Sequence, residues 1–295
     1  MQIFNSNELK KLYRPPKDSH KGQSGKLLVI GGSKLFHAAS IWSLTVASRI
    51  VDMVYYASVE ENNTVVEHLK EEFRNGIVIP RGKIDEYIDE ADCVLIGPGL
   101  PRKEGEEEGD DDTKELTETL LKKYQKKKWV IDGGSLQTID PSCIPKNAIL
   151  TPHRGEFEKL FSHVIPNLFR DPGSKEMLKQ VQHDNAREQD DIVSKMAKEY
   201  NSVILLKGQE DIVCSPTTCV VIKGGNAGMT KGGTGDVLAG LVAALACKND
   251  PFLAACAGSY INKKAGDSLY KQVGPYFNAS DLCDEIPKVI KGLLF

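Results

Sequence analysis

The segment GGNAGMTKGGTGDVLAG, residues 224–240, is the stretch of this chain that says most about its fold. Glycine has no Cβ, so the backbone can adopt positive φ and its amide groups can converge on a ligand. The small residues that follow predict a helix from Asp236 to Cys247, opened by Thr234 or Gly235. The N-terminus of such a helix adds the positive end of its dipole. The segment therefore predicts an anion hole suited to a terminal phosphate.

Asp236 is the residue of this segment that we expect to carry chemistry. At the helix start it would face the anion hole formed by Gly233, Thr234 and Gly235. A carboxylate does not suit a phosphate, but it can take a proton from an attacking hydroxyl. The combination predicts phosphoryl transfer to an alcohol. The alternative is that Asp236 only caps the helix, and the nearby Asn226 and flanking glycines favour the catalytic interpretation.

Two common nucleotide-binding patterns are absent from the sequence. It contains no G-x-x-x-x-G-K-[ST] segment, so the glycine-rich loop is not a Walker A loop. It contains no G-x-G-x-x-G segment either, so a Rossmann site for a nicotinamide cofactor lacks its fingerprint.

Outside this segment, short apolar runs alternate with helical stretches. We expect strands at residues 26–30, 53–57, 77–79, 91–96, 129–132, 148–151 and 202–206, and a hairpin formed by 211–214 and 219–222. We expect helices at 38–50, 116–127, 191–200, 236–247 and 254–270. The alternation predicts an α/β fold with a mainly parallel central sheet and helices on both faces. Ligands of such sheets bind at the carboxyl ends of the strands, at a topological switch point.

We expect a single domain over residues 1–295, with its core from about residue 20, because no linker separates two cores. Two segments interrupt the pattern. Residues 103–112 are strongly acidic and predict a solvated surface excursion, with metal collection as the alternative. Residues 163–184 exceed the usual connection of about 2–6 residues. They resemble translated mobile repeat elements, and we interpret them as a tolerated surface insertion.

Composition limits the class of protein. The chain is 40% hydrophobic and 27% charged, and its net charge of -3 gives no electrostatic case for nucleic acid or an anionic membrane. No stretch reaches the roughly 20 apolar residues of a membrane span, and the N-terminus lacks the apolar core of a signal peptide. We therefore expect a cytoplasmic protein. The seven cysteines form no CxxC pair, which predicts buried thiols such as Cys93, without a disulfide framework or structural zinc.

Five segments together carry a specific resemblance. The sequence GGTGD before a small-residue helix resembles the anion hole of the ribokinase-like superfamily. Four further segments narrow the resemblance to one family within that superfamily. They closely resemble the ADP/ATP-dependent NAD(P)H-hydrate dehydratase family, and they are HKGQSGK (20–26), GPGL (97–100), TPHRGE (151–156) and LKG (206–208). The similarity runs from about His20 to the C-terminus. Because the chain begins almost at these segments, we expect a dehydratase without the N-terminal epimerase domain that many family members have.

The resemblance implies a metabolite repair reaction. NAD(P)H that has taken up water at carbon 6 of its nicotinamide ring is phosphorylated on the ring hydroxyl by ADP or ATP with Mg²⁺. Phosphate then leaves and the double bond is restored. Bacterial and archaeal members usually use ADP. The implied partners are hydrated NADH or NADPH, an adenine nucleotide, further copies of the chain in a homo-oligomer that is often a tetramer, and a separate epimerase.

The resemblance also implies roles for individual residues. Asp236 would deprotonate the ring hydroxyl, and Gly233, Thr234 and Gly235 would supply the anion hole. The residues implied to contact the hydrated nicotinamide are Ala39, Gly99, His153 and Asp236. Those implied to contact the adenine nucleotide are Lys207, Gly208, Gln209, Glu210, Asp211, Asn226 and Gly235. Glu156 is a candidate for Mg²⁺ or water, and equally for a first-turn helix residue.

Structural interpretations stand beside these roles. Lys207 could be a surface lysine at a strand end, His153 could pin a turn, Asp132 could cap one, and Gly97 and Gly99 could be ordinary turn glycines.

The chain departs from the family pattern at two positions. Arg154 stands where the family usually has proline, and Ala38 where glycine is common. We expect both to affect substrate affinity more than chemistry.

Two rival functions remain at this stage. Another ribokinase-like kinase, such as a hydroxymethylpyrimidine or hydroxyethylthiazole kinase, would share residues 233–236 but stop at a stable phosphate ester. The TPHRGE and HKG segments argue against it. A non-catalytic nucleotide-binding protein would bind ADP without turnover.

Overall fold

The structure is a computed structural model that describes residues 1–68, 75–102, 107–162 and 191–295. Ten strands of the described chain form one sheet, in the order β1-β10-β9-β8-β7-β6-β5-β2-β3-β4. They are β1 (Gln2–Ile3), β2 (Lys26–Ile30), β3 (Met53–Ala57), β4 (Ile77–Val78), β5 (Cys93–Ile96), β6 (Lys128–Ile131), β7 (Ile149–Leu150), β8 (Val203–Leu206), β9 (Asp211–Cys214) and β10 (Cys219–Ile222).

Every neighbouring pair of strands from β4 to β8 in this order is parallel. Only the hairpin of β9 and β10 introduces antiparallel pairs, and β1 joins β10 in parallel. The expected α/β fold with a mainly parallel sheet is confirmed. The chain runs from β2 to β3 and β4 on one side, then returns to β5 on the other side of β2. The gap between β2 and β5 is therefore the topological switch point.

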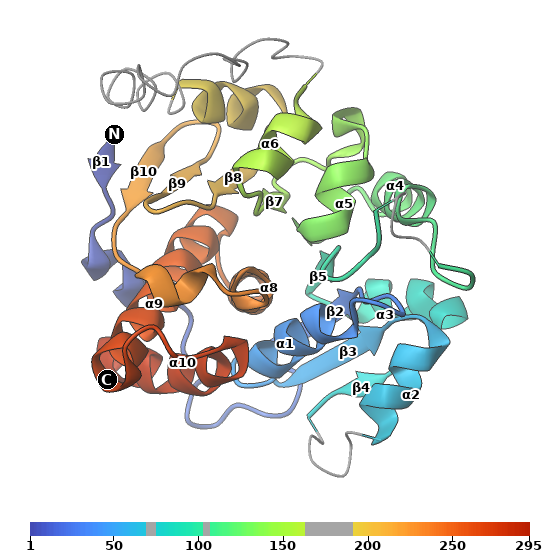
Figure 1. Cartoon of the computed structure of the whole chain (residues 1–295), viewed down its shortest axis with the longest axis horizontal. Helices are drawn as coiled ribbons and strands as arrows, with labels where there is room; N and C mark the ends of the chain where they lie inside the picture. Colours follow the sequence, from blue (N-terminus) through green and yellow to red (C-terminus); the bar gives the residue numbers. More distant parts are fainter. Residues whose placement is uncertain (69–74, 103–106, 163–190) are drawn as a thin grey trace.

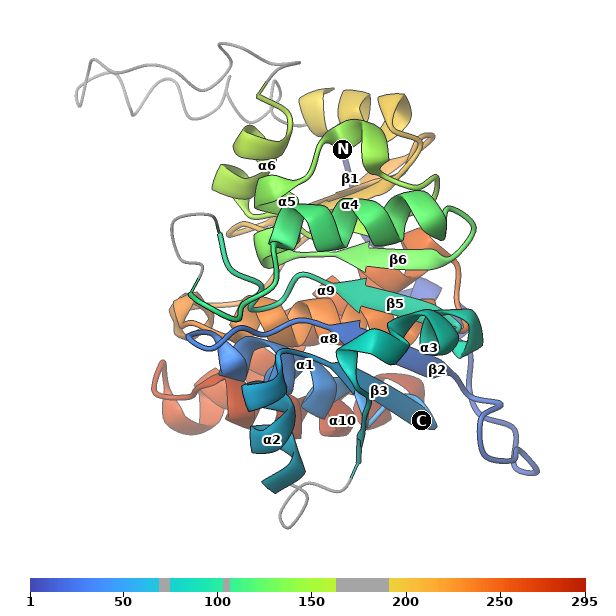
Figure 2. The ribbon, with the colours of Figure 1, turned by 90° about the vertical axis from the view of Figure 1, so that its right-hand side faces the viewer.

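Helices cover both faces of the sheet, as expected (Figures 1 and 2). They are α1 (His37–Ala47), α2 (Glu60–His68), α3 (Ile84–Glu90), α4 (Thr113–Lys123), α5 (Gly133–Thr138), α6 (Arg154–Leu160), α8 (Thr234–Ala246), α9 (Pro251–Val273) and α10 (Ala279–Leu294). Residues 191–199 are also helical. One core packs α1, α8, α9 and α10 against the sheet, and the other packs α3 to α6 and the 191–199 helix. In the described chain, no helix has the length and apolar character needed to cross a bilayer.

Helix α8 lies near the centre of the molecule, with α1, α9 and α10 around it (Figure 1). Every residue from Val237 to Ala246 is buried. A helix that is apolar on all sides is expected to be buried, which explains the run of alanine, valine, leucine and glycine seen in the sequence. Because α8 contacts β5 and β6, it lies against the middle of the sheet.

The described part of the acidic segment, residues 107–112, is exposed or half-buried and makes specific contacts with the rest of the fold. Asp110 Oδ1 accepts a hydrogen bond from the backbone amide of Lys34 at 3.0 Å, and Asp111 forms an ion pair with Arg81. Asp112 caps α4, which begins three residues earlier than the apolar periodicity indicated. Acidic residues are favoured at a helix N-terminus. Residues 103–106, and the whole of 163–184, lie outside the described residues.

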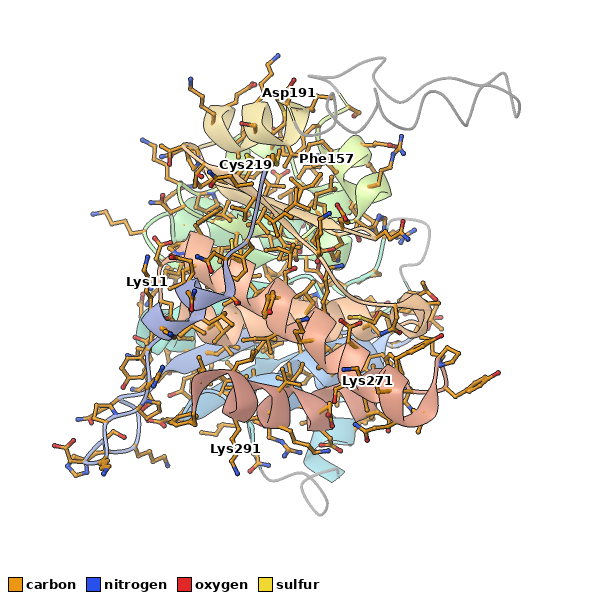
Figure 3. All side chains as sticks on the ribbon, turned by 90° about the vertical axis from the view of Figure 1, so that its left-hand side faces the viewer. Lys11, Phe157, Asp191, Cys219, Lys271 and Lys291 are labelled. Carbon is orange, nitrogen blue, oxygen red and sulfur yellow. A yellow bond between two sulfur atoms is a disulfide. The ribbon has the colours of Figure 1, made fainter. Side chains whose placement is uncertain are left out.

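The expectation of free thiols is wrong for one pair of cysteines. Cys214 and Cys219 form a disulfide across the β9–β10 hairpin (Cys219 is labelled in Figure 3). The hairpin register places these two residues directly opposite each other, which a search for closely spaced CxxC pairs does not detect. The five cysteines that are free and buried, as expected, are Cys93, Cys143, Cys247, Cys256 and Cys283.

Candidate active site

Asp236 is the third residue of α8 and not its cap. The N-cap is Gly233, and no side-chain hydrogen bond caps this end of α8. The first amides of a helix have no partner within the helix. The Thr234 amide donates to the Lys231 carbonyl at 3.4 Å, so those of Gly235 and Asp236 are the ones left to the first turn. The interpretation of Asp236 as a simple cap is therefore wrong, and the helix begins at Thr234, one of the two predicted positions.

The backbone before Asp236 requires glycine at position 233. Gly233 has φ 93°, and a Cβ there would lie 2.4 Å from the ring of Trp42 and 2.7 Å from Ala279 Cβ. The hydroxyl of Thr234 donates to the carbonyls of Met229 at 2.7 Å and Lys231 at 2.9 Å. These contacts hold the amides of the predicted anion hole in place before any ligand arrives.

Lys207 lies beside this turn and is not a surface lysine. Its Nζ donates to Asp132 Oδ1 at 2.8 Å and lies 3.8 Å from Glu156 Oε2. It also lies 3.5 Å from the point that a Cβ on Gly235 would occupy. Thr151 donates its hydroxyl to the same Asp132 oxygen at 2.7 Å. Asp132 is the N-cap residue of α5, but its side chain makes no capping hydrogen bond, so it pairs with Lys207 instead of capping the turn.

The cluster of charges shifts the pKa of its members. The pKa of Asp236 is raised to about 7, mainly by burial and also by the carboxylates of Asp132 and Glu156, against the opposing charge of Lys207. Burial lowers the pKa of Lys207, but the carboxylates of Asp132 and Glu156 outweigh it and the net shift is upward. Lys207 therefore stays cationic, while Asp236 can exchange a proton near neutral pH. That is the range in which a general base works best.

His153 and Glu156 form a capping box at the start of α6. His153 Nδ1 accepts from the Glu156 amide at 3.2 Å, and Glu156 Oε2 accepts from the His153 amide at 2.9 Å. Glu156 Oε1 accepts from Gln137 Nε2 at 3.1 Å. Both structural interpretations, the pinned turn and the first-turn helix residue, are confirmed. His153 still keeps 54% of its side chain exposed beside Lys207, its partner in an isolated parallel bridge.

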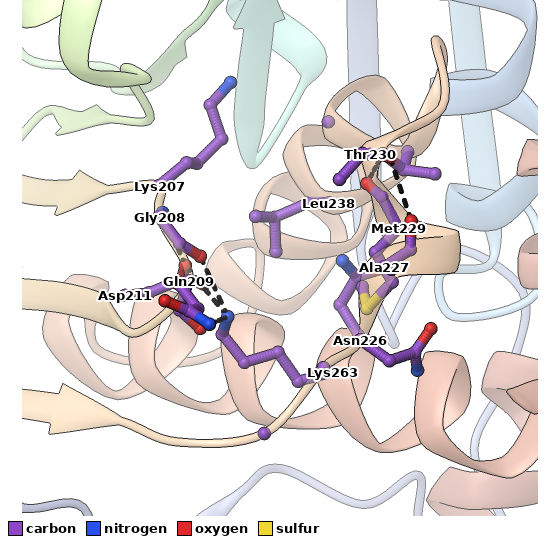
Figure 4. A pocket seen from close by; sticks show the side chains of 15 residues that line it. Lys207, Gly208, Gln209, Asp211, Asn226, Ala227, Met229, Thr230, Leu238 and Lys263 are labelled. Carbon is purple, nitrogen blue, oxygen red and sulfur yellow. Dashed lines mark hydrogen bonds and ion pairs between the residues drawn. The ribbon is translucent and has the colours of Figure 1, made fainter. Parts of the chain in front are cut away.

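A cavity of about 550 Å³ lies against the start of α8 (Figure 4). This is within the range of about 300–1,000 Å³ for small-molecule sites. Six of the seven residues expected to contact a nucleotide line it: Lys207, Gly208, Gln209, Asp211, Asn226 and Gly235. The seventh, Glu210, does not line it and instead forms an ion pair with Lys223. Asp236 lies next to the lining residues Thr234 and Gly235 without being part of the lining itself.

Two of the expected nucleotide residues shape the cavity wall through internal contacts. Asp211 accepts from the Gly208 amide at 2.9 Å and pairs with Lys263 Nζ at 3.1 Å. Asn226 caps the short 3-10 helix η7 (Ala227–Thr230) by accepting from the Gly228 amide at 3.0 Å.

Sequence reasoning missed the contribution of α9 to this wall, which consists of Asn262 and Lys263. No motif marks them, because they reach the cavity only through the packing of α9.

Ala39 and Gly99 meet at the switch point. Gly99 has φ 73°, and a Cβ there would lie 3.2 Å from Ala39 Cβ and 2.4 Å from the Phe36 carbonyl oxygen. Gly99 is thus required by close backbone approach and not only by its turn. One turn after Ala39, Ser43 donates its hydroxyl to the Asp236 carbonyl at 2.8 Å. The structure therefore brings Ala39 and Gly99 to the side of α8 that adjoins α1, whereas His153 lies beside Lys207.

The described residues contain no cluster of three His, Cys, Asp or Glu side chains that could hold a metal ion by themselves. Mg²⁺ commonly binds through one or two carboxylates together with substrate phosphates. The site therefore fits a metal that arrives with a nucleotide better than a resident one.

The sheet and its helices form an α/β fold of the ribokinase-like class. A ribokinase-like superfamily protein from Enterococcus faecalis superposes with a TM-score of 0.73 at 20% identity, covering 99% of this chain and 96% of that one. A family model described as NAD(P)H-hydrate dehydratase matches residues 27–288. The chain belongs to the NAD(P)H-hydrate dehydratase family.

Relatives agree with this assignment. The chain is 36% identical over 298 residues to a bifunctional NAD(P)H-hydrate repair enzyme from Methanocaldococcus jannaschii, covering 98% of this chain and 52% of that protein. It is 33% identical over 286 residues to an ADP-dependent (S)-NAD(P)H-hydrate dehydratase from Nitrosopumilus maritimus, covering 92% and 91%. The chain thus spans about half the length of the bifunctional relatives.

A solved structure has the same fold over its whole length. The ADP/ATP-dependent NAD(P)H-hydrate dehydratase from Bacillus subtilis, co-crystallised with ATP and Mg²⁺, superposes with a TM-score of 0.76 at 20% identity. The superposition covers 99% of this chain and 98% of that one.

Proposed function

We propose that this protein is an ADP-dependent NAD(P)H-hydrate dehydratase that repairs hydrated NADH or NADPH. Membership of the family and the relative from Nitrosopumilus maritimus support the reaction and the donor. The observation that carries the proposal is the arrangement at the start of α8. A carboxylate with its pKa near neutral lies in the first turn of a helix, next to a lysine whose side chain is only 18% exposed.

In the first step, Asp236 takes the proton of the ring hydroxyl, and the hydroxyl oxygen attacks the terminal phosphorus of ADP. The amides of Gly233, Thr234 and Gly235, together with Lys207, meet the charge on the transferred phosphoryl group. AMP is the leaving group, and a phosphate ester forms on carbon 6.

In the second step, the lone pair of the ring nitrogen expels phosphate from carbon 6. The neighbouring ring carbon then loses a proton and the double bond returns. Ala39 and Gly99 would hold the ring on the α1 side of α8, and His153 would approach it from beside Lys207.

When bound with the nucleotide, Mg²⁺ would neutralise charge on the phosphate oxygens. Glu156 stays a candidate ligand, since each of its carboxylate oxygens accepts one hydrogen bond and keeps a further lone pair.

The test is an assay with hydrated NADH, ADP and Mg²⁺, run in parallel with ATP. We expect the absorbance of reduced nicotinamide to return, with one AMP and one phosphate released per molecule repaired when ADP is the donor. Asp236→Asn should lower kcat by about 10²–10⁴-fold, the usual contribution of a general base, and keep much of the nucleotide affinity.

Asp284→Asn is the matched control. Asp284 is an exposed residue of α10 that forms an ion pair with Arg49, and surface ion pairs contribute little to stability. A phosphorylated product without recovered absorbance would identify a small-molecule kinase. ADP binding with no turnover, unchanged by Asp236→Asn, would identify a non-catalytic binding protein.

Four other expectations stay predictions: a homo-oligomer such as a tetramer, a single domain, a cytoplasmic location and a separate epimerase as partner.

A further inference from the structure

Asp132 and Thr151 are buried polar residues to which the proposed reaction gives no direct role. They follow β6 and β7, and Lys207 follows β8, so all three lie at the carboxyl ends of adjacent strands. The Thr151 hydroxyl donates to Asp132 Oδ1 at 2.7 Å, and Lys207 Nζ donates to the same oxygen at 2.8 Å. The hydroxyl thus holds the carboxylate in place, and the carboxylate holds the ammonium.

The two lysines of the cavity wall differ in where their charge is directed (Figure 4). The interactions of Lys263 Nζ are with the cavity wall itself: it donates to the carbonyls of Gly208 and Gln209 and pairs with Asp211. Lys207 turns away from that group, toward the position next to Gly235 in the first turn of α8. Its contacts with Asp132 and Glu156 leave N–H capacity for a ligand, because an ammonium has three donors.

We propose that Asp132, held by Thr151, is a positioning residue that keeps the Lys207 ammonium over the anion hole, where it receives the terminal phosphoryl group of the nucleotide. The inference rests on the proposed function for the identity of the reaction. The contact between Lys207 and the terminal phosphate does not depend on it. Without Asp132, Lys207 is free to move closer to Glu156, now 3.8 Å away, or to Asp236, whose charge already acts on it. Either move withdraws the cation from the phosphate.

The experiment compares Asp132→Asn and Thr151→Val with the wild-type protein. For each protein, kcat and KM are measured with hydrated NADH and ADP. The dissociation constants of ADP and AMP are measured separately by calorimetry in the presence of Mg²⁺. Misplacing a reacting group by about 1 Å can cost about 10²-fold in rate, so Asp132→Asn should lower kcat by about 10²-fold with little change in KM for hydrated NADH.

The ratio of the AMP and ADP dissociation constants isolates the contact with the terminal phosphate. A hydrogen bond from a charged group changes binding by about tenfold or more, so Asp132→Asn should reduce the preference for ADP over AMP by about tenfold. Thr151→Val should change both readouts in the same direction by less. Asp132→Glu, which keeps the charge, should recover part of the loss.

The matched control is Glu285→Gln, because Glu285 is another buried carboxylate held by a hydroxyl and a lysine. It accepts from the Ser268 hydroxyl at 2.6 Å and from Lys288 Nζ at 2.9 Å, between α9 and α10. This variant should lose thermal stability and keep the preference for ADP.

If Asp132→Asn lowers only thermal stability and keeps both kcat and the ADP preference, the pair merely ties strands together and the inference is wrong. If the wild-type protein shows no turnover but Asp132→Asn still loses the ADP preference, the proposed function fails and the inference stands.

Discussion

At residue 236, burial and the helix N-terminus act on one carboxylate in opposite directions. Burial raises the pKa of an acid, while the positive end of a helix lowers it. In this protein burial and the neighbouring carboxylates prevail, and the pKa of Asp236 is about 7. An ordinary aspartate would be ionised at every physiological pH and would be a weaker base.

This pKa predicts how activity depends on pH. Because the proposed base must be ionised to accept a proton, kcat/KM should fall about tenfold per pH unit below about pH 7 and level off above it. A pH–rate profile of the dehydratase assay measures this. A profile that is flat from about pH 5 to about pH 8 would contradict Asp236 as the base with this pKa.

The same shift has a consequence for stability that serves as an independent check. Between about pH 4 and pH 7 the folded protein keeps a proton on Asp236 that the unfolded chain has released. The binding of this proton stabilises the folded state, and this stabilisation is lost as pH rises through the window. Asp236→Asn removes the effect. The variant should therefore unfold at a higher temperature than the wild type at about pH 8, and at the same temperature near pH 4.

Some residues of the site stand in a short sequence motif, and others do not. Asp236, Gly233 and Lys207 stand in short motifs whose meaning comes from backbone geometry, and the structure places them together. Asn262 and Lys263 lie in an unremarkable part of α9, and only helix packing turns them toward the cavity. The packing of one helix against another depends on residues distant in sequence, so no local pattern could have identified them.

At the scale of elements, the start of α8 depends on the loop before it. Gly232 and Gly233 are neighbours in the same glycine run, but their surroundings differ. Gly233 has positive φ and lies against Trp42, while a Cβ on Gly232 would meet nothing within 4 Å. The sequence alone does not distinguish them.

This difference predicts opposite outcomes for two alanine substitutions. Gly233→Ala should reduce the free energy of unfolding by about 1–3 kcal/mol, because alanine at positive φ is strained and its methyl group collides with Trp42. Gly232→Ala is the control and should change it by less than about 0.5 kcal/mol. Denaturant titration measures both. Equal effects would show that residue 233 does not need its positive φ.

Element boundaries and some whole elements were not predicted. The pattern of apolar runs detected the long strands, but not β1, α2, α3, α5 or α10. Helix α10 begins with a capping box of Asn278 and Asp281 and continues through Pro287. A proline inside a helix normally costs about 3 kcal/mol, so the packing of α10 against α1 and α9 overrides a local signal that argues against a helix.

At the scale of the whole molecule, the nucleotide cavity is formed by segments that are far apart in the sequence. Its walls come from the loop after β8, from η7 and from the helices α8 and α9. A ligand that fills it contacts all of these elements only in the folded state, so binding and folding are linked.

ADP with Mg²⁺ should therefore stabilise the protein against unfolding. At a concentration of about 100 times its dissociation constant, a ligand that binds only the folded state adds about 2.7 kcal/mol. Thermal unfolding with increasing ADP measures the effect, and inorganic phosphate at the same concentration is the control. An unchanged unfolding temperature would contradict the assignment of this cavity to the nucleotide.

Sequence by itself determined the α/β class, the mainly parallel sheet and the glycine-rich turn before α8, because each depends on periodicity or conformational freedom within a short stretch. Tertiary structure alone decided which charges meet at that turn. Lys207 and Asp132 are 75 positions apart, and Thr151 is 19 positions from Asp132, so only the order of strands across the sheet makes them neighbours. The pairing of Cys214 with Cys219 is likewise a property of strand register, which the spacing of residues does not reveal.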